Sequence, residues 1–355
     1  MHEKFLDTVL TDTKPLFETN KKAIHNYNKN MIPKSFLVAI ITLIIPFIIS
    51  IFKQDMVSTF PAYIIALSLM LILFVLYQVK RYQRYTLLFA YLFCTILYVL
   101  VMYLSIFKFY DRPAASIIIF FVVVPLIFVD KSMRMNTVII STYIIHAVLS
   151  YIFKGTHLGS VDILNTTIAI AFGMLFGRLF LISRLKTFEI EKQLIIEKET
   201  DFLTKLYNRR KLYNDLISMD VLGVEKLGII LFDLDHFKAY NDKYGHLNGD
   251  KFLEIFGKAL LEIQGNFPIK FYRFGGEEIV GVTKGLTKAE VMMLAEHIRT
   301  SVKNLDVPME KLTVSIGVSI IDYKVDQTID YYLEKADKAL YKAKENGRDK
   351  IEFNM

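Results

Sequence analysis

Two hydrophobic patterns divide the chain near residue 183. Before this point, long apolar segments alternate with short polar stretches, and most approach the roughly 20 residues that a helix needs to cross a bilayer. The apolar segments are residues 35–52, 58–79, 86–107, 114–129, 137–153 and 163–182. Beyond residue 183, short apolar runs alternate with helix-period patterns, as is typical of α/β domains. We therefore predict an all-α multi-span membrane domain followed by an α/β domain.

The α/β half contains a predicted hairpin with further strands and helices around it. Its expected strands are residues 227–232, 269–274, 279–282 and 312–320, and its expected helices include residues 287–303 and 328–345. A further helix is predicted where four apolar residues follow a helical spacing: Phe252, Ile255, Phe256 and Leu260. Strands that flank a hairpin, with helices between them, predict an α/β sandwich with a largely antiparallel sheet.

Charge is distributed unevenly between the two halves. The 355-residue chain is 53% hydrophobic and carries a net charge of +7. Residues 1–182 hold 16 Lys/Arg and 8 Asp/Glu, whereas residues 183–355 hold 27 and 28. The basic excess belongs to the apolar half, where it reports membrane topology and gives no indication of nucleic-acid binding. Cys94 is the only cysteine, which excludes a disulfide framework and a thiolate metal site.

Clusters of basic residues follow the second, fourth and sixth apolar segments. They are Lys80, Arg81, Arg84, Lys131, Arg134, Arg184 and Lys186. Under the positive-inside rule, six spans then place both ends of the chain in the cytoplasm. We predict a cytoplasmic segment at residues 1–34 and a six-helix transmembrane sensor domain at residues 35–182. His146, in the middle of a span, could sense a ligand or protons, or form an interhelical hydrogen bond.

Residues 183–200 are rich in glutamate and lysine and predict a linker helix. A seven-residue repeat forms one seam of a short coiled coil, with Leu181, Phe188, Ile195 and Phe202 as its members. The second seam is weak, so a solvated linker helix is the alternative. A parallel stalk that joins two protomers fits the repeat better, and residues 201–355 would follow it as the second domain.

The predicted hairpin carries two adjacent acidic residues. Gly275 and Gly276 lie between apolar runs and predict its turn, because glycine adopts positive φ without steric cost. Glu277 and Glu278 follow immediately, although adjacent like charges repel each other. This cost indicates a ligand, and paired carboxylates beside an apolar sheet favour Mg²⁺ bound to phosphates. The alternative is a charged hairpin tip exposed to solvent.

Further acidic residues end the first strand of the α/β half. Asp233 and Asp235 are two residues apart on a strand, so we expect both side chains on the same side. If this strand neighbours the hairpin, Asp233 and Glu277 can converge on a divalent cation. Lys238 follows within a turn and could neutralise a phosphate.

Residues 241–250, which we interpret as a loop, hold three spaced polar side chains. They are Asn241, His246 and Asp250. An amide and a carboxylate together can read the edge of guanine. Three basic residues add positive charge suited to a triphosphate: Arg273, Lys344 and Arg348. Taken alone, each of these could be a solvated surface charge.

Together, these stretches resemble the GGDEF family of diguanylate cyclases across about residues 200–353. The motifs that carry the resemblance are residues 201–210, 232–238, 245–250, 273–279, 314–317 and 336–348. All of the family's main motifs are present in order, including Arg273-Phe-Gly-Gly-Glu-Glu-Ile279. The signature departs at Ile279, where the family usually has phenylalanine. We expect a buried apolar replacement with little chemical loss.

The resemblance implies a metal site and a GTP site. Mg²⁺ or Mn²⁺ would be held by Asp233, the backbone carbonyl of Leu234 and Glu277, with support from Glu278. Glu277 would also be a candidate base for the attacking hydroxyl, and Lys238 would stabilise charge on the reacting phosphates. The other positions would bind substrate: Arg273, Lys344 and Arg348 along the triphosphate, Asn241 and Asp250 at guanine, and His246 in the nucleoside pocket.

The family reaction joins two GTP molecules into cyclic di-GMP and releases two pyrophosphates. Each protomer presents one GTP, so the resemblance implies a homodimer formed through the stalk and the cyclase domain. With the spans, it predicts a multi-pass cyclase in the bacterial inner (cytoplasmic) membrane, with its cyclase domain in the cytoplasm. One alternative is a non-catalytic GGDEF-fold binding module, which has no reason to keep these residues together. Another is a transporter, which lacks support from charge inside the spans.

Overall fold

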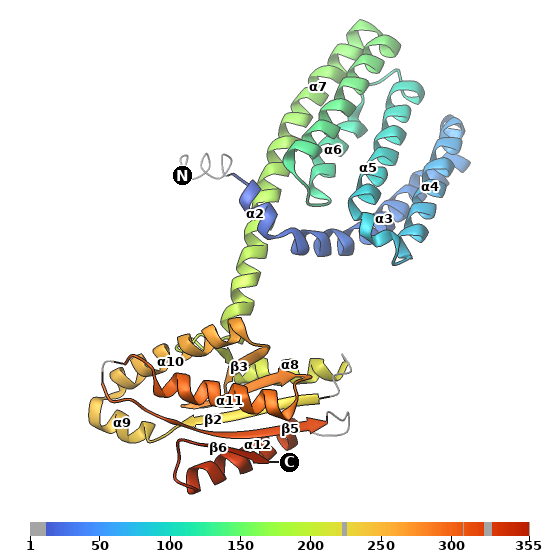
Figure 1. Cartoon of the computed structure of the whole chain (residues 1–355). Coiled ribbons are helices and arrows are strands. Elements are labelled where there is room, and N and C mark those ends of the chain that lie inside the picture. Colours follow the sequence, from blue (N-terminus) through green and yellow to red (C-terminus); the bar gives the residue numbers. More distant parts are fainter. Residues whose placement is uncertain (1–11, 222–225, 308, 323–328, 355) are drawn as a thin grey trace. The chain divides into compact units, whose positions relative to one another are not determined.

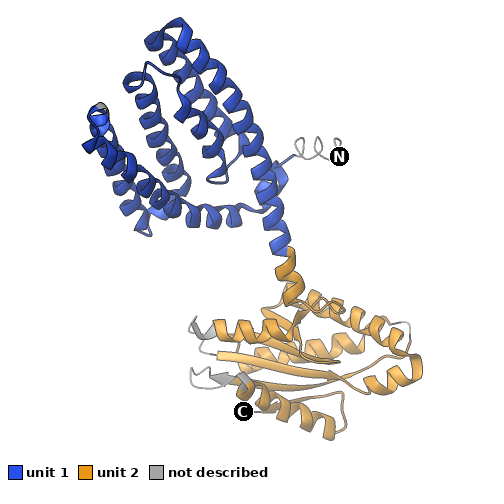
Figure 2. Ribbon diagram, turned by 180° about the vertical axis from the view of Figure 1, so that it is seen from behind, with its two compact units in different colours: residues 1–192 blue, residues 193–355 orange. Residues whose placement is uncertain are grey.

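The computed structural model describes residues 12–221, 226–307, 309–322 and 329–354. The chain forms two compact units, residues 1–192 and 193–355, which Figure 2 colours separately. Their boundary falls inside the predicted linker helix at residues 183–200. Residues 1–11 of the predicted N-terminal segment lie outside the described residues.

The first unit is helical, as predicted. Its helices are α2 (Lys14–Thr19), α3 (Lys21–Phe52), α4 (Phe60–Gln78), α5 (Thr86–Tyr103), α6 (Ala115–Val123) and α7 (Ser132–Glu199), with short 3₁₀ or π turns between some of them. Each predicted apolar segment lies largely within one of these helices. Among the described residues, four helices are long and apolar enough to cross a membrane. This number is below six because α6 has nine residues and α7 contains two predicted segments.

Helix α7 is interrupted at Gly155, whose φ of 75° lies in the left-handed region. The chain reverses there, because Ser150 and Lys154 before the break both donate to Asp162 beyond it, at 2.6 and 2.8 Å. Asp162 also accepts from the backbone N–H of Ala114, at 2.7 Å. This ion pair lies between the predicted apolar segments 137–153 and 163–182 and so places no charge inside either of them. The sequence places these two charges eight residues apart, at the edges of two apolar segments.

His146 lies one helical turn before Ser150 and is fully buried. Within the described part of the chain, neither of its ring nitrogens has a hydrogen-bond partner. Its ring instead lies 6.5 Å from the ring of Phe121. The structure therefore does not support the interhelical hydrogen bond that is one of the two roles considered for His146.

The predicted coiled-coil seam begins inside the first unit. Leu181 and Phe188 are buried in a cluster with Leu185 and with Phe17 and Ile24 from the start of the chain. In this region the seam is thus covered by the chain's own N-terminal helices. In the second unit, by contrast, Ile195 and Phe202 are 56% and 81% exposed. Only this later part of the seam has an apolar surface free for a second protomer.

The second unit is built on a six-stranded sheet in the order β1-β3-β4-β2-β5-β6. The strands are β1 (Tyr207–Asn208), β2 (Lys226–Leu234), β3 (Ile269–Arg273), β4 (Glu278–Lys284), β5 (Val314–Asp322) and β6 (Ile351–Asn354). The three central pairings are antiparallel, but β1 pairs with β3 and β5 with β6 in parallel. The sheet is therefore mixed, and the prediction of a largely antiparallel sheet is wrong at both edges. Strands β1 and β6 have two and four residues, too few to show an alternating pattern.

Helices cover both faces of this sheet (Figure 1). Helices α9 (Phe237–Tyr244), α10 (His246–Asn266) and α11 (Lys288–Lys303) pack on one face. Helices α8 (Arg209–Val221) and α12 (Ile329–Glu345) pack on the other. Strand β2 is central and buried from its second residue onward, which explains its continuous apolar pattern. Its carboxyl end, beside the β3–β4 hairpin, brings the predicted site residues together.

Candidate active site

The glycine turn connects β3 to β4, as predicted, and is closed by backbone hydrogen bonds. Phe274 and Gly275 both donate to the carbonyl of Glu278, at 2.9 and 3.3 Å. Neither Gly275 nor Gly276 has positive φ, so the reason expected for these glycines is wrong. A Cβ at Gly275 would lie 3.0 Å from a carboxylate oxygen of Glu278, whereas one at Gly276 would meet nothing within 4 Å. The absence of side chains at the two glycines instead avoids a close contact with Glu278 and leaves open space beside the carboxylates.

Three carboxylates converge at this edge of the sheet. The antiparallel register places Asp233 of β2 opposite Glu278 of β4, which confirms that this strand neighbours the hairpin. Asp233 is buried, while Glu277 and Glu278 are half-buried. Burial raises the pKa of Asp233, and the charges of Glu277 and Glu278 raise it further, against the opposing effect of Lys344. Carboxylates held together at a cost are typical of a cation site.

The donor set at this edge suits Mg²⁺ or Mn²⁺. Carboxylate and carbonyl oxygens are hard ligands, and Mg²⁺ is usually held by one or two carboxylates together with substrate phosphates. Among the described residues, no three His, Cys, Asp or Glu side chains form a complete metal cluster by themselves. The Nζ atom of Lys344 lies 3.2 Å from Oδ1 of Asp233 and offsets part of the negative charge, but the pKa of Asp233 stays raised. Asp233, Glu277 and the Leu234 carbonyl therefore fit a metal that binds together with a triphosphate.

Asp235 does not belong to this carboxylate group. Strand β2 ends at Leu234, and the buried side chain of Asp235 accepts hydrogen bonds from the hydroxyls of Thr313 and Ser315, at 2.7 and 2.6 Å. It also accepts from the backbone N–H of Asp349, at 3.1 Å. Asp235 is therefore held by hydrogen-bond partners of its own, whereas Asp233 lies opposite Glu278 in the β2–β4 register.

The predicted guanine-binding residues lie on two helices, and the interpretation of residues 241–250 as a loop is wrong. Asn241 is on α9 and Asp250 is on α10, and Gly245, with a φ of 81°, separates the helices. The Oδ1 atom of Asn241 is buried and, among the described residues, has no hydrogen-bond partner. A Cβ at Gly249 would lie 1.8 Å from this atom, so a side chain there would displace the amide of Asn241. An unpaired buried acceptor favours an N–H donor supplied by a ligand.

The remaining predicted residues are solvent-accessible. Lys238 and Asp250 are exposed, as are His246 at the start of α10 and Arg348 after α12. Exposure leaves these charged and polar groups available to a substrate. It gives no independent support for their individual roles, which stay predictions.

Arg273 is already engaged within the protein. Its Nη1 atom donates to Asp201 at 2.8 Å, and its Nε and Nη2 atoms donate to the carbonyl of Gly276 at 3.1 and 2.8 Å. Burial alone would raise the pKa of Asp201, but hydrogen bonds from Thr204 and Arg273 outweigh it and lower the pKa. These contacts support a role in holding the glycine turn, and contact with the triphosphate stays a prediction for Arg273.

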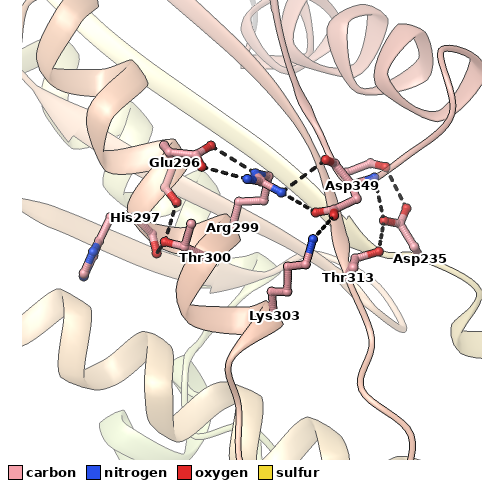
Figure 3. A network of polar contacts seen from close by, with 9 residues as sticks. Asp235, Glu296, His297, Arg299, Thr300, Lys303, Thr313 and Asp349 are labelled. Carbon is pink, nitrogen blue, oxygen red and sulfur yellow. Dashed lines mark hydrogen bonds and ion pairs between the residues drawn. The ribbon is translucent and has the colours of Figure 1, made fainter.

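Asp201 is a supporting residue that the sequence reasoning did not assign. Its carboxylate caps the backbone N–H of Thr204 at 2.8 Å as well as binding Arg273. The available signal was the segment Asp201-Phe-Leu-Thr204, in which an acidic side chain lies three residues before a threonine. A second unassigned group consists of Arg299 and Lys303 of α11 with Asp349 (Figure 3). No local pattern links these residues, because 46 to 50 positions separate them.

Several curated proteins similar to this chain are named as diguanylate cyclases or probable ones. The probable diguanylate cyclase DgcF of Escherichia coli (strain K12) is 33% identical over 166 residues, which cover 45% of this chain and 52% of the relative. Diguanylate cyclase A of Treponema denticola is 33% identical over 168 residues, which cover 45% of each protein. The chain thus spans about half the length of these curated relatives.

The same region is similar to solved domains. The active GGEEF domain of a diguanylate cyclase from Vibrio cholerae is 31% identical, with 42% of this chain and 97% of that chain covered and a TM-score of 0.38. A family model described as diguanylate cyclase, GGDEF domain, matches residues 198–350. Through this region, which carries Asp233, Glu277 and Asn241, the chain belongs to the GGDEF family of diguanylate cyclase domains.

Proposed function

We propose that this chain is a membrane-anchored diguanylate cyclase, which condenses two GTP molecules into cyclic di-GMP and two pyrophosphates. The observation that carries the proposal is the convergence of Asp233 with Glu277 and Glu278 beside an open glycine turn. A folding domain gains nothing from burying these like charges together. A GGDEF-fold binding module without catalysis would have no need for this arrangement.

The carboxylates and Lys238 carry the chemistry in this proposal. Asp233, Glu277 and the Leu234 carbonyl, with support from Glu278, would hold Mg²⁺ or Mn²⁺, which would supply positive charge to the phosphates and lower the pKa of the attacking hydroxyl. Glu277 takes the proton from that 3′-hydroxyl as it attacks the α-phosphate of the other GTP. Lys238 stabilises the charge that develops on the phosphates, and pyrophosphate leaves. Most of the rate gain comes from positioning and charge neutralisation.

The other polar residues hold the substrate in this proposal. Asn241 and Asp250 accept hydrogen bonds from the guanine N–H groups, and His246 lines the nucleoside pocket. The unpaired Oδ1 atom of Asn241 supports this assignment, because a guanine donor would satisfy it. Lys344 and Arg348 lie along the triphosphate, and Arg273 joins them only if it exchanges Asp201 for a phosphate.

Dimerisation is part of the proposed mechanism. One site holds one GTP, so a second protomer must supply the other half of the ring. The exposed positions Ile195 and Phe202 offer a contact between stalks, whereas Leu181 and Phe188 are covered within one chain. Specific activity should therefore rise with protein concentration, and a constant specific activity in a demonstrably monomeric sample would contradict this part of the proposal.

We further infer that residues 35–182 form a six-helix sensor domain in the bacterial inner membrane. Residues 1–34 form a cytoplasmic segment, residues 183–200 a linker stalk, and residues 201–355 the cytoplasmic cyclase domain. The apolar helices and the basic residues after alternate segments support this topology.

The test is product analysis with the full-length protein in detergent or in membrane vesicles. With GTP and Mg²⁺, chromatography should show cyclic di-GMP, and a coupled assay should show two pyrophosphates for each product molecule. Glu334 provides a matched control for Glu277, because it is an exposed glutamate on α12 that pairs with Lys338. A wild-type protein that binds GTP but forms no cyclic dinucleotide would favour the binding-module alternative.

A further inference from the structure

The turn that follows α12 has an unusual backbone. Gly347, Arg348 and Asp349 all have positive φ, at 101°, 60° and 43°. Glycine adopts this conformation freely, but it is uncommon for arginine and aspartate. Two consecutive side-chain-bearing residues in this region persist only where the surrounding structure holds them there.

Asp349 is the residue that is held. Its Oδ1 atom accepts from Nη1 of Arg299 at 2.5 Å, and its Oδ2 atom accepts from Nζ of Lys303 at 2.6 Å (Figure 3). Arg299 is itself fixed by Glu296, through contacts of 3.0 and 2.7 Å to the two carboxylate oxygens. Burial raises the pKa of Asp349, but the Lys303 and Arg299 cations outweigh it and lower the pKa. Asp349 is therefore an anion clamped by two cations.

Both cations come from a rigid helix. Helix α11 begins with a capping box between Thr287 and Glu290, and its apolar face is buried in the core through residues that include Val291 and Ile298. Networks anchored in this way lose less side-chain entropy than isolated surface pairs. Helix α11 thus provides a fixed base for the turn at residues 347–349.

The same turn is tied to the strand that carries the metal carboxylate. The backbone N–H of Asp349 donates to Asp235, two residues beyond Asp233, at 3.1 Å. Asp235 is held in turn by Thr313 and Ser315 of the neighbouring chain segment. Arg348 lies between Gly347 and Asp349, is exposed, and its backbone N–H donates to Ala343 of α12 at 3.1 Å. Within the described residues its guanidinium makes no hydrogen bond or ion pair.

We propose that Arg299 and Asp349 are positioning residues for GTP, which hold Arg348 at a fixed place relative to Asp233. The clamp keeps Asp349 in the left-handed region and bound to Asp235, and this fixes the backbone from which the Arg348 side chain extends. The inference rests on the proposed function, in which Arg348 binds the triphosphate. Neither Arg299 nor Asp349 touches the substrate.

The test is steady-state kinetics of the full-length protein carrying Arg299→Ala. Without the clamp, Arg348 samples many orientations, so KM for GTP should rise about tenfold while kcat changes less than about threefold. Arg299→Lys keeps a charge and should recover part of the loss. Lys338→Ala removes an exposed ion pair on α12 and should leave KM unchanged. A wild-type KM in a folded Arg299→Ala protein would overturn the proposal.

A double-mutant cycle with Arg348→Ala separates positioning from general stability. If Arg299 acts through Arg348, then Arg299→Ala should add little to the KM of Arg348→Ala. If the two substitutions raise KM independently, so that the double mutant shows the product of the two increases, the network only stabilises the fold.

Equilibrium binding of GTP, measured without turnover, distinguishes this proposal from the proposed function. If the wild-type protein binds GTP without forming product, the proposed function is refuted. The double-mutant cycle can then be measured with the Kd for GTP in place of KM. Absence of GTP binding to the wild type overturns both.

Discussion

Two regions meet at the end of strand β2, and they surround a buried carboxylate with different neighbours. In the site region, formed by Asp233, Glu277 and Glu278, burial and like charges raise the pKa of Asp233. In the anchor region, formed by Asp235, Asp349, Arg299 and Lys303, Asp235 accepts three hydrogen bonds and two cations clamp Asp349. Only one residue separates Asp233 from Asp235.

The difference shows how the neighbours of a carboxylate indicate whether it binds a ligand or stabilises the fold. A buried anion whose neighbours supply enough donors stabilises a fold, because its hydrogen bonds replace those lost from water. A buried anion beside other anions, whose pKa stays raised although one lysine is near it, costs stability and is kept where a ligand supplies further positive charge. The site region and the anchor region should therefore respond differently to substitution.

The largest expected effect is loss of activity from the site region. Asp233→Ala or Glu277→Ala should reduce cyclic di-GMP formation by at least ~10³-fold, because each removes a proposed metal ligand and its charge stabilisation. Both proteins should remain folded by circular dichroism, and Glu334→Ala should keep wild-type activity. Near-normal turnover in a folded Glu277→Ala protein would remove this residue from the mechanism.

The next effect concerns nucleotide choice. Asp250 can accept from guanine N1–H and its exocyclic amine, whereas adenine presents an unprotonated N1. We expect a preference for GTP over ATP of at least ~100-fold in kcat/KM, and its reduction in Asp250→Ala. Competition between equal concentrations of the two nucleotides measures this preference. Substantial cyclic di-AMP or mixed product from the wild type would argue against the assignment of Asp250.

A smaller effect in free energy should come from the anchor region. Asp235→Ala leaves the hydroxyls of Thr313 and Ser315 and the N–H of Asp349 without their acceptor. We expect a loss of about 2 kcal/mol in the free energy of unfolding of the cyclase domain. The chain has no tryptophan, so near-ultraviolet circular dichroism of its tyrosines can follow unfolding. Equal stability of Asp235→Ala and wild type would show that the anchor region does not stabilise the fold.

The smallest effect is a gain in stability with a specific pH dependence. The pKa of Asp233 is raised in the folded protein, so its protonated form stabilises the fold. This contribution is fully present below the pKa of the unfolded state and is lost as pH rises through the pKa of the folded state. At pH 7 the ionised carboxylate therefore costs stability, and Asp233→Asn should raise Tm by about 3 °C. The gain should shrink toward pH 4. A gain that does not vary with pH would mean that charge is not its cause.

Acid should act on Asp349 in the opposite direction. Its folded pKa is lowered, so its contribution is present above the unfolded pKa and is lost as pH falls through the folded value. Asp349→Asn should therefore lower Tm at pH 7 and converge with wild type in acid. The two substitutions together give a direct comparison of the regions within one domain.

Much of the local structure was determined by the sequence itself. Apolar periods placed the helices of the first unit and the strands β2 to β5, because burial of one face or of a whole segment is a local property. Ile279, the departure from the family signature, is fully buried as expected. The two glutamates after the glycine turn indicated a ligand site, because adjacent like charges have a cost that neighbours in the chain already reveal.

Other features were decided only by the tertiary structure, because they depend on which segments become neighbours. The parallel edge strands, the different roles of Asp233 and Asp235, and the covering of Leu181 and Phe188 all follow from long-range packing. Arg273 has the residue type of a phosphate ligand, yet Asp201, 72 positions away, binds its guanidinium. The type and spacing of side chains limit the roles that a residue can have, but the residue that contacts it in the folded protein decides which role it takes.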